Sequence, residues 1–171
     1  MDALIVIFIT GLISLFVAFM RKPMLVLGTS LLGLLIAAAL LLNQWNHPYN
    51  LLAYKGLSFD HTAISYSLVA VLFTFLSILV GYKSFKEQLD HTGDYVALFL
   101  FSLTGALCIV SFTDMFMFFI GLEILSIPIY VLAGSKKKDA YSAEASLKYF
   151  LTGAFATGVL LFGIAWVYGA V

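Results

Sequence analysis

The chain has 171 residues, of which 63% are hydrophobic and 11% are charged. A soluble domain is about half apolar and about a quarter charged, so this composition excludes an ordinary soluble domain and indicates that most of the chain lies in lipid. Nine basic and nine acidic residues cancel to a net charge of zero. That balance gives no electrostatic reason to expect a nucleic-acid partner.

Six apolar runs are long enough to span a bilayer, which takes about 20 residues as helix. Because lipid offers the backbone no hydrogen-bond partners, each run must be helical, and we expect an all-α polytopic membrane protein. Residues 51–59, in the longest loop, are a candidate for a short strand or hairpin. The six runs lie at about 3–20, 24–43, 64–82, 95–113, 115–134 and 143–169.

Basic residues are distributed unevenly over the loops. The loops after the first, third and fifth runs hold seven lysines and arginines, and the opposite side holds only Lys55. Since basic residues are retained on the cytoplasmic side, we expect the N-terminus outside and these three loops inside. We interpret the Lys136–Lys138 run as a solvated topology signal. The seven basic residues are Arg21, Lys22, Lys83, Lys86, Lys136, Lys137 and Lys138.

Metal and disulfide chemistry have little support in the sequence. The lone cysteine, Cys108, lies in an apolar run and has no partner for an internal disulfide. His47, His61 and His91 are scattered over loops without a common ligand spacing. We therefore expect no metal site, and we expect Cys108 to pack as a small apolar side chain.

Two ionisable side chains lie inside apolar runs. Glu123 is near the middle of the fifth run, and Lys148 is about two turns into the sixth. A charge in hydrocarbon costs about 2.5 kcal/mol or more on insertion scales, so each is a candidate functional residue. Asp114, just before the fifth run, is better explained as a loop or cap residue.

Helical spacing surrounds Glu123 with polar groups. Ser126 at i+3 and Tyr130 at i+7 share its face. Pro128 has no N–H, so the carbonyl of Ile124 loses its usual partner. We expect this cluster to hold water or to carry protons. The alternative is a structural role, in which a protonated Glu123 donates a hydrogen bond that joins two helices.

Lys148 lies in a second polar stripe, with Glu144 at i−4 and Thr152 at i+4. It is about 7–8 Å from the expected start of its helix, whereas Glu123 is about 16 Å from the end of the fifth run. Our hypothesis is that Lys148 relays protons between cytoplasmic water and Glu123, which requires Lys148 to face the fifth helix. The alternative is that Lys148 snorkels to the interface and pairs with Glu144.

The segment FFIGLEILSIPIYVLAG, a basic turn and the segment AEASLKYFLTGAFATGVLLFGIAWVYGA closely resemble the N subunits of the proton-pumping NADH–quinone oxidoreductase, complex I. These are antiporter-like membrane subunits of the bacterial inner membrane. The resemblance implies that Glu123 and Lys148 match the family's helix-five glutamate and helix-six lysine, which take part in proton translocation. It also implies partnership with other membrane subunits of complex I, with lipid and with protons.

The resemblance further implies that this chain acts as part of an H⁺-translocating enzyme complex without a redox centre of its own. NADH, flavin, iron–sulfur clusters and quinone would bind in partner subunits. Two other members of the same superfamily are alternatives: a subunit of a multi-subunit cation/proton antiporter and a subunit of a membrane-bound hydrogenase. A non-transporting helical assembly subunit is a further alternative from a different class.

Full family members have about fourteen helices, including two inverted five-helix repeats. We therefore expect a truncated chain, with three N-terminal helices in residues 1–93 and the first three helices of an incomplete proton-channel repeat in residues 94–171. The helix-seven lysine that would pair with Glu123 is not in this sequence. We expect a half-channel entrance, without proton conduction by these residues alone.

Overall fold

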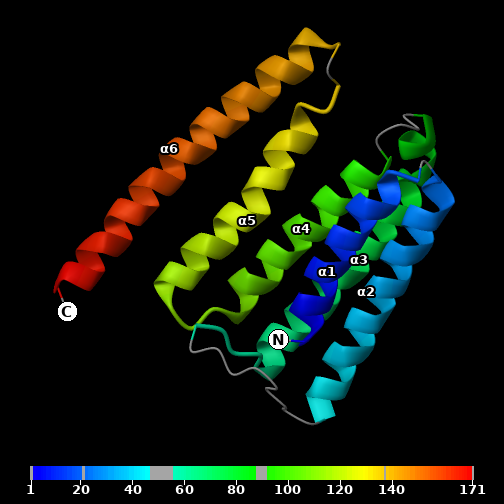
Figure 1. Cartoon of the computed structure of the whole chain (residues 1–171). Coiled ribbons are helices and arrows are strands. Elements are labelled where there is room, and N and C mark those ends of the chain that lie inside the picture. Colours follow the sequence, from blue (N-terminus) through cyan, green and yellow to red (C-terminus); the bar gives the residue numbers. More distant parts are fainter. Residues whose placement is uncertain (1, 21, 47–55, 88–91, 137, 171) are drawn as a thin grey trace.

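The structure is a computed structural model, and it describes residues 2–20, 22–46, 56–87, 92–136 and 138–170. Within these ranges, six helices run up and down in chain order (Figure 1). They confirm the all-α fold and the number of helices expected from hydropathy. The helices are α1 (Asp2–Ala18), α2 (Pro23–Asn46), α3 (His61–Glu87), α4 (Thr92–Ser111), α5 (Met115–Ala133) and α6 (Ala140–Ala170).

Five of the helices, α2 to α6, are long and apolar enough to cross a membrane. The first helix, α1, is also apolar but has only 17 residues. At about 1.5 Å per residue it is about 26 Å long, slightly shorter than the hydrocarbon core of a typical bilayer. The first expected run therefore forms a helix, but a shorter one than its hydropathy indicated.

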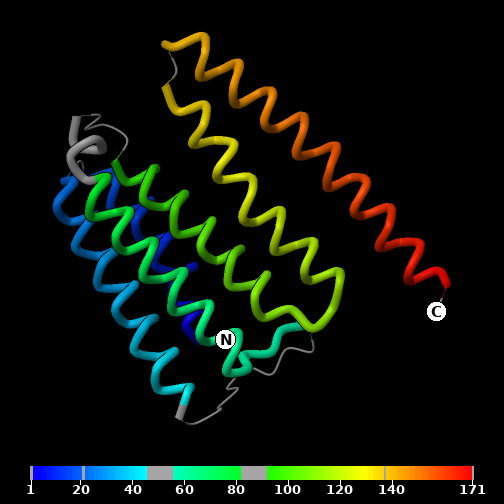
Figure 2. Tube along the Cα trace, turned by 180° about the vertical axis from the view of Figure 1, so that it is seen from behind, coloured from blue at the N-terminus to red at the C-terminus, as the bar shows by residue number. Residues whose placement is uncertain are grey.

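The helices differ in how much of their surface is buried against other helices. Helices α1 to α4 pack together, α5 packs on α4, and α6 packs mainly on α5. Both views show α6 at the outer edge, apart from the four-helix group (Figures 1 and 2). Within the most apolar stretch of each helix, 56% of α4 is buried but only 6% of α6. The centre of the packed unit is thus α4, and α6 has most of its surface uncovered.

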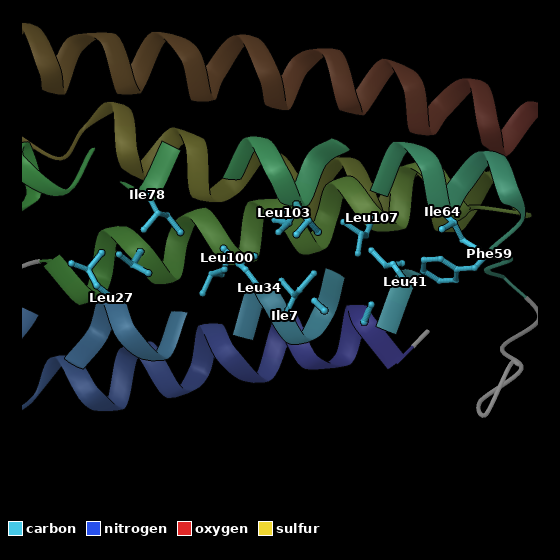
Figure 3. Packing of buried hydrophobic residues seen from close by; sticks show 14 of the residues in the cluster. Ile7, Leu27, Leu34, Leu41, Phe59, Ile64, Ile78, Leu100, Leu103 and Leu107 are labelled. Atoms are coloured by element: carbon cyan, nitrogen blue, oxygen red, sulfur yellow. The ribbon is translucent and has the colours of Figure 1, made fainter. Parts of the chain in front are cut away.

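The hydrophobic core lies among α1, α2, α3 and α4 (Figure 3). Ile7, Leu34, Ile78, Leu100 and Leu107 are fully buried there. Cys108 is also buried and unbridged on α4, as expected of a small apolar side chain. None of the functional residues predicted from the sequence lies in this core. The core supports α5, which packs on α4, and α6 packs in turn on α5.

One backbone bridge ties the loop before α3 to the turn between α4 and α5. Leu57 pairs with Phe112 in an isolated antiparallel bridge. The Ser58 N–H donates to the Ser111 carbonyl at 2.7 Å, and the Thr113 N–H donates to the Gly56 carbonyl at 3.0 Å. The strand or hairpin expected at 51–59 is therefore limited to one bridge residue where the structure describes the chain, and residues 51–55 lie outside the described part.

The turns alternate between two ends of the bundle. The α1–α2 turn with Lys22, the end of α3 and the α5–α6 turn with Lys136 and Lys138 lie at one end, and the α4–α5 turn lies at the other (Figure 1). The basic residues that the structure describes in these connections thus share one end. This arrangement agrees with the expected orientation, which stays a prediction.

Helices α4 and α5 approach each other closely at Gly105. A Cβ added to Gly105 would lie 2.3 Å from the Leu125 nitrogen and 2.8 Å from the Gly121 carbonyl oxygen. These are backbone atoms, which cannot rotate away as a flexible side chain can. Gly105 therefore permits a contact between helix backbones, the role that small residues have in packed membrane helices.

We predict that Gly105→Ala destabilises the chain by about 1–3 kcal/mol, because α5 must move away from α4. Unfolding in mixed detergent micelles measures this change. The matched control is Gly28→Ala, since an added Cβ there has open space around it. That variant should be neutral or gain up to about 1 kcal/mol from helix propensity. Equal effects of the two substitutions would contradict the close backbone contact.

Candidate functional site

Helix α5 carries the candidate acid and has well-defined ends. The side chain of Asp114, the N-cap residue, accepts a hydrogen bond from the Phe116 N–H at 3.0 Å. At the other end, the N–H of the C-cap residue Gly134 donates to carbonyls of the last turn. The prediction of Asp114 as a cap residue is confirmed, and the capped helix sets the depth of every residue along it.

On one side, α5 is fixed against α4. Besides the Gly105 contact, Gly121 lies against Ile109 and Cys108. The Ser102 hydroxyl donates to the Leu125 carbonyl across the interface at 3.2 Å. Two residues of α5, Gly121 and Leu125, thus define the side of the helix that faces α4.

Glu123 lies on the other side of α5. At about 100° per residue, it is rotated about 160–200° from Gly121 and Leu125 and only about 20° from Tyr130. Tyr130 faces α6, so Glu123 points toward the α6 side and away from α4. Its side chain is half-buried. We find no hydrogen bond or ion pair for Glu123 within the ranges that the structure describes.

The polar groups expected around Glu123 are engaged elsewhere. The Ser126 hydroxyl donates to the Leu122 carbonyl of its own helix at 2.6 Å. The Tyr130 ring packs edge-on against Tyr149 and Phe150, with centroid distances of 4.9 and 5.8 Å. These residues share the predicted face, but no described hydrogen bond joins them to the carboxylate.

Tyr130 packs closely against α6. A Cβ added to Gly153 would lie 2.0 Å from the Tyr130 hydroxyl oxygen. Near the same end, the Ser142 hydroxyl donates to the Ala133 carbonyl at 2.7 Å. Tyr130 therefore anchors α6 to α5. The helical pattern indicated only that Tyr130 shares a face with Glu123 and did not predict this packing role.

Pro128 has a different position from the rest of the expected cluster. It is buried within α5 and lies on the side of the helix toward α4. The neighbouring hydroxyl, from Ser102, bonds the Leu125 carbonyl and not the Ile124 carbonyl that the proline was expected to free. Ser102 was missed in the sequence. A serine one turn from Gly105, on a helix packed beside a proline-containing helix, was the available signal.

Lys148 is exposed and paired on its own helix. Its Nζ lies 2.5 Å from Oε1 of Glu144, and the two side chains are 73% and 57% exposed. The Thr152 hydroxyl donates to the Lys148 carbonyl at 2.8 Å. This geometry contains the Lys148–Glu144 pair that the alternative interpretation of the sequence predicted. Lys148 is not buried.

Lys148 faces away from α5. The α6 residues that contact α5 include Ser146, Tyr149 and Gly153, and Lys148 is rotated about 200° from Ser146. The direct relay from Lys148 to Glu123 required the lysine to face α5. That hypothesis is wrong for this arrangement, because helical rotation places the lysine on the far side of α6.

Depth separates the two charges as well. The contacts of Tyr130 with Gly153 and of Asp114 with Tyr168 set the antiparallel register of α5 and α6. In this register Glu123 is level with about residue 159, whereas Lys148 is level with about residue 134. The two are about 16 Å apart along the helix axis. They cannot form a pair within this chain.

A contact at the far end of α6 was not foreseen from the sequence. The Tyr168 hydroxyl donates to Oδ1 of Asp114, which also accepts the Phe116 N–H. These two donors hold the pKa of the Asp114 carboxyl below its usual value. The partners are 54 positions apart in the chain, so no local pattern would have predicted the pair.

Three known proteins match almost the whole chain. The NADH-quinone oxidoreductase subunit N of Cytophaga hutchinsonii is 39% identical over an aligned length of 171 positions, which covers 99% of this chain and 37% of that protein. The subunit N of Flavobacterium psychrophilum is 35% identical, with the same coverage. A chain of respiratory complex I from Thermus thermophilus, solved with bound aureothin, superposes with a TM-score of 0.79 at 29% identity, over 99% of this chain and 37% of that chain.

The fold is that of a polytopic membrane protein, with one acidic side chain, Glu123, inside the apolar helix α5. Residues 113–171 match the family model described as NADH:quinone oxidoreductase/Mrp antiporter, TM. Over its whole length the chain resembles subunit N of NADH–quinone oxidoreductase, so the resemblance seen in the sequence is confirmed. The chain spans about 37% of the length of these relatives.

We predict that Gly153→Ala weakens the packing of α6 on α5 by about 1–3 kcal/mol, because the new methyl group would clash with the Tyr130 hydroxyl. Adding Tyr130→Phe removes the clashing oxygen and should restore part of the loss. Unfolding titrations of both single variants and the double variant measure this coupling. Gly158→Ala, where an added Cβ has open space, is the control. Strictly additive effects at positions 130 and 153 would contradict the anchor.

Proposed function

We propose that this chain is part of an N-like membrane subunit of NADH–quinone oxidoreductase in a bacterial inner membrane. It would cross the membrane several times and assemble with other membrane subunits of complex I. Its function would be to couple quinone reduction to proton translocation. The similarity to two subunits N over 99% of the chain supports this assignment.

The observation that carries the proposal is the position of Glu123. An acidic side chain in an apolar helix is costly, so a half-buried carboxyl without a described partner requires a functional reason. A carboxyl can bind and release one proton. Movement of the neighbouring helices would change how well its charge is solvated. Glu123 is therefore the group we assign to proton uptake and release.

Lys148 has a separate role in this proposal. It forms an ion pair with Glu144 on the face of α6 that points away from α5. An exposed pair of this kind is weak and can exchange partners. We assign Lys148 to proton translocation together with protein groups that would pack on that face of α6. Glu144 is the partner of Lys148 when those groups are not engaged. Thr152, bonded to the Lys148 carbonyl, would support the local helix.

The redox groups belong to partner subunits in this proposal. Iron–sulfur clusters are held by several cysteine thiolates, and this sequence has one cysteine. In the described ranges no group of three or more histidine, cysteine and acidic residues is placed to hold a metal. The chain itself would contribute protonatable side chains, while NADH, flavin and quinone chemistry take place elsewhere in the complex.

We also propose a functional division of the chain. Residues 1–93 would form an N-terminal scaffold of three helices. Residues 94–171 would form the first three helices of a proton-channel repeat. The family match at residues 113–171, which include α5 and α6, supports the placement of the site in the second part.

The test is Glu123→Gln in the full subunit within its complex, because this change removes titration and keeps side-chain size. We expect proton pumping per electron to fall strongly, with assembly unchanged. Pumping is measured in vesicles by quenching of a pH-sensitive dye, together with the rate of NADH oxidation. Glu123→Asp keeps the acid and shortens its reach, so it should have a milder effect.

Normal pumping stoichiometry in the Glu123→Gln complex would refute the assignment. A complex that fails to assemble would instead favour the structural alternative, in which Glu123 joins helices and the chain is an assembly subunit. Assembly is checked by native electrophoresis of the same membranes. Lost proton flux in a normally assembled complex would exclude that alternative.

A second candidate function is that of a subunit of a multi-subunit cation/proton antiporter, with a membrane-bound hydrogenase as a related case. The family description that matches residues 113–171 includes Mrp antiporters, which favours keeping this candidate. Transport measured with and without sodium separates the two functions. Proton movement driven by NADH oxidation without sodium supports the first function, and sodium-dependent exchange supports the second.

A further inference from the structure

Helix α6 is held to α5 at two ends by different kinds of contact. At the lysine-turn end, Tyr130 packs on Gly153 and the Ser142 hydroxyl donates to the Ala133 carbonyl. At the opposite end, the Tyr168 hydroxyl donates to the Asp114 carboxylate. At the first end, close packing holds the two helices together, whereas at the second end a hydrogen bond between side chains does so. We call these two contacts the closures of the α5–α6 interface.

The Asp114 side of this second closure is rigid. Asp114 is the N-cap of α5, and its carboxylate is fixed by the Phe116 N–H. The turn before it is bound to the loop ahead of α3 by the Thr113–Gly56 backbone hydrogen bond. Asp114 thus projects from a turn that is anchored to the four-helix group.

The Tyr168 side can move more readily. Helix α6 has 31 residues, and Tyr168 lies about 42 Å along it from Ala140. Only 6% of the most apolar stretch of α6 is buried, and Ile164 is the buried residue of this helix. Figures 1 and 2 show α5 and α6 spreading apart toward this end. Tyr168 reaches across that spread to Asp114.

Glu123 lies between the two closures. It is about 10 Å along α5 from Tyr130 and about 13–14 Å from Asp114. It shares the α6 side of α5 with Tyr130, as described above. Any path from water to Glu123 along the α5–α6 interface must therefore pass one closure or the other.

We propose that the Asp114–Tyr168 hydrogen bond is a latch that limits access of water to position 123 from the end opposite the lysine turn. Asp114 is exposed in the turn between α4 and α5, so water at this end of the bundle competes for its carboxylate and the bond can open. Packing of Tyr130 against the Gly153 backbone has no such competition. The latch end is then the one that opens. Only the link to proton flux rests on the proposed function of Glu123.

Thiol accessibility of position 123 tests the latch in the full 171-residue chain. Glu123→Cys is made in a Cys108→Ala background and reconstituted into liposomes. A membrane-impermeant maleimide is then applied from the Asp114 side. We expect Tyr168→Phe, which keeps the ring and removes the hydroxyl, to raise the labelling rate about fivefold, the change expected from losing one net hydrogen bond.

Two controls separate a latch from general loosening of the fold. Tyr141→Phe removes an exposed phenol at the other end of α6 and should leave the rate unchanged. Reagent applied from the lysine-turn side should label position 123 at the same rate with and without Tyr168→Phe. Asp114→Asn keeps an acceptor oxygen and should give a smaller increase than Asp114→Ala.

Equal labelling rates for Tyr168→Phe and Tyr141→Phe would overturn the latch, as would an equal increase from both sides of the membrane. Because the reporter is a cysteine, the result does not depend on whether Glu123 carries protons. Normal pumping by the Glu123→Gln complex would refute the proposed function and leave the latch standing. An unchanged labelling rate would refute the latch and leave the function standing.

Discussion

The arrangement of the candidate site depends on the contact between the backbones of α4 and α5 at Gly105. This contact fixes the rotation of α5, because Gly121 and Leu125 must face α4. Glu123, about half a turn around the helix, is thereby directed to the α6 side. A different rotation would place the acid against α4, where close packing leaves no room for a hydrated carboxylate.

The features of the fold that could be predicted from the sequence are those that depend on local pattern. Hydropathy located all six helices, since a helix in lipid needs an uninterrupted apolar run. Asp114 was identified as a cap from its position before an apolar run, and Cys108 was expected to be buried. The position of Glu123 along α5 also followed from rise per residue. Lys148 lies about 12 Å from the start of α6, and not about 7–8 Å, because the helix begins at Ala140, three residues earlier than expected.

Contacts between helices could not be predicted in the same way, because they depend on how each helix is rotated. The hydropathy pattern of α6 is nearly uniform around the helix, so it did not show that Lys148 faces away from α5. Tyr130 was predicted as a polar neighbour of Glu123 but packs on Gly153. The Asp114–Tyr168 and Leu57–Phe112 contacts join residues that are distant in the chain and have no shared local pattern.

The two charges of the apolar runs therefore differ in kind. Glu123 is half-buried without a described partner, whereas Lys148 is exposed and paired with Glu144. If both take part in proton translocation, they act on opposite faces of α6. The face of α6 that carries Lys148 and Glu144 points away from α5, whereas Glu123 lies on the side of α5 that faces α6.

Site-directed cross-linking measures the direction of Glu123 most directly. In a Cys108→Ala background, Glu123→Cys is paired either with Thr157→Cys on α6 or with Ile109→Cys on α4, and a short bifunctional maleimide is added. The rotation of α5 described here predicts efficient cross-linking to position 157 and little to position 109. Cross-linking to position 109 in preference to position 157 would contradict the placement of Glu123 on the α6 side.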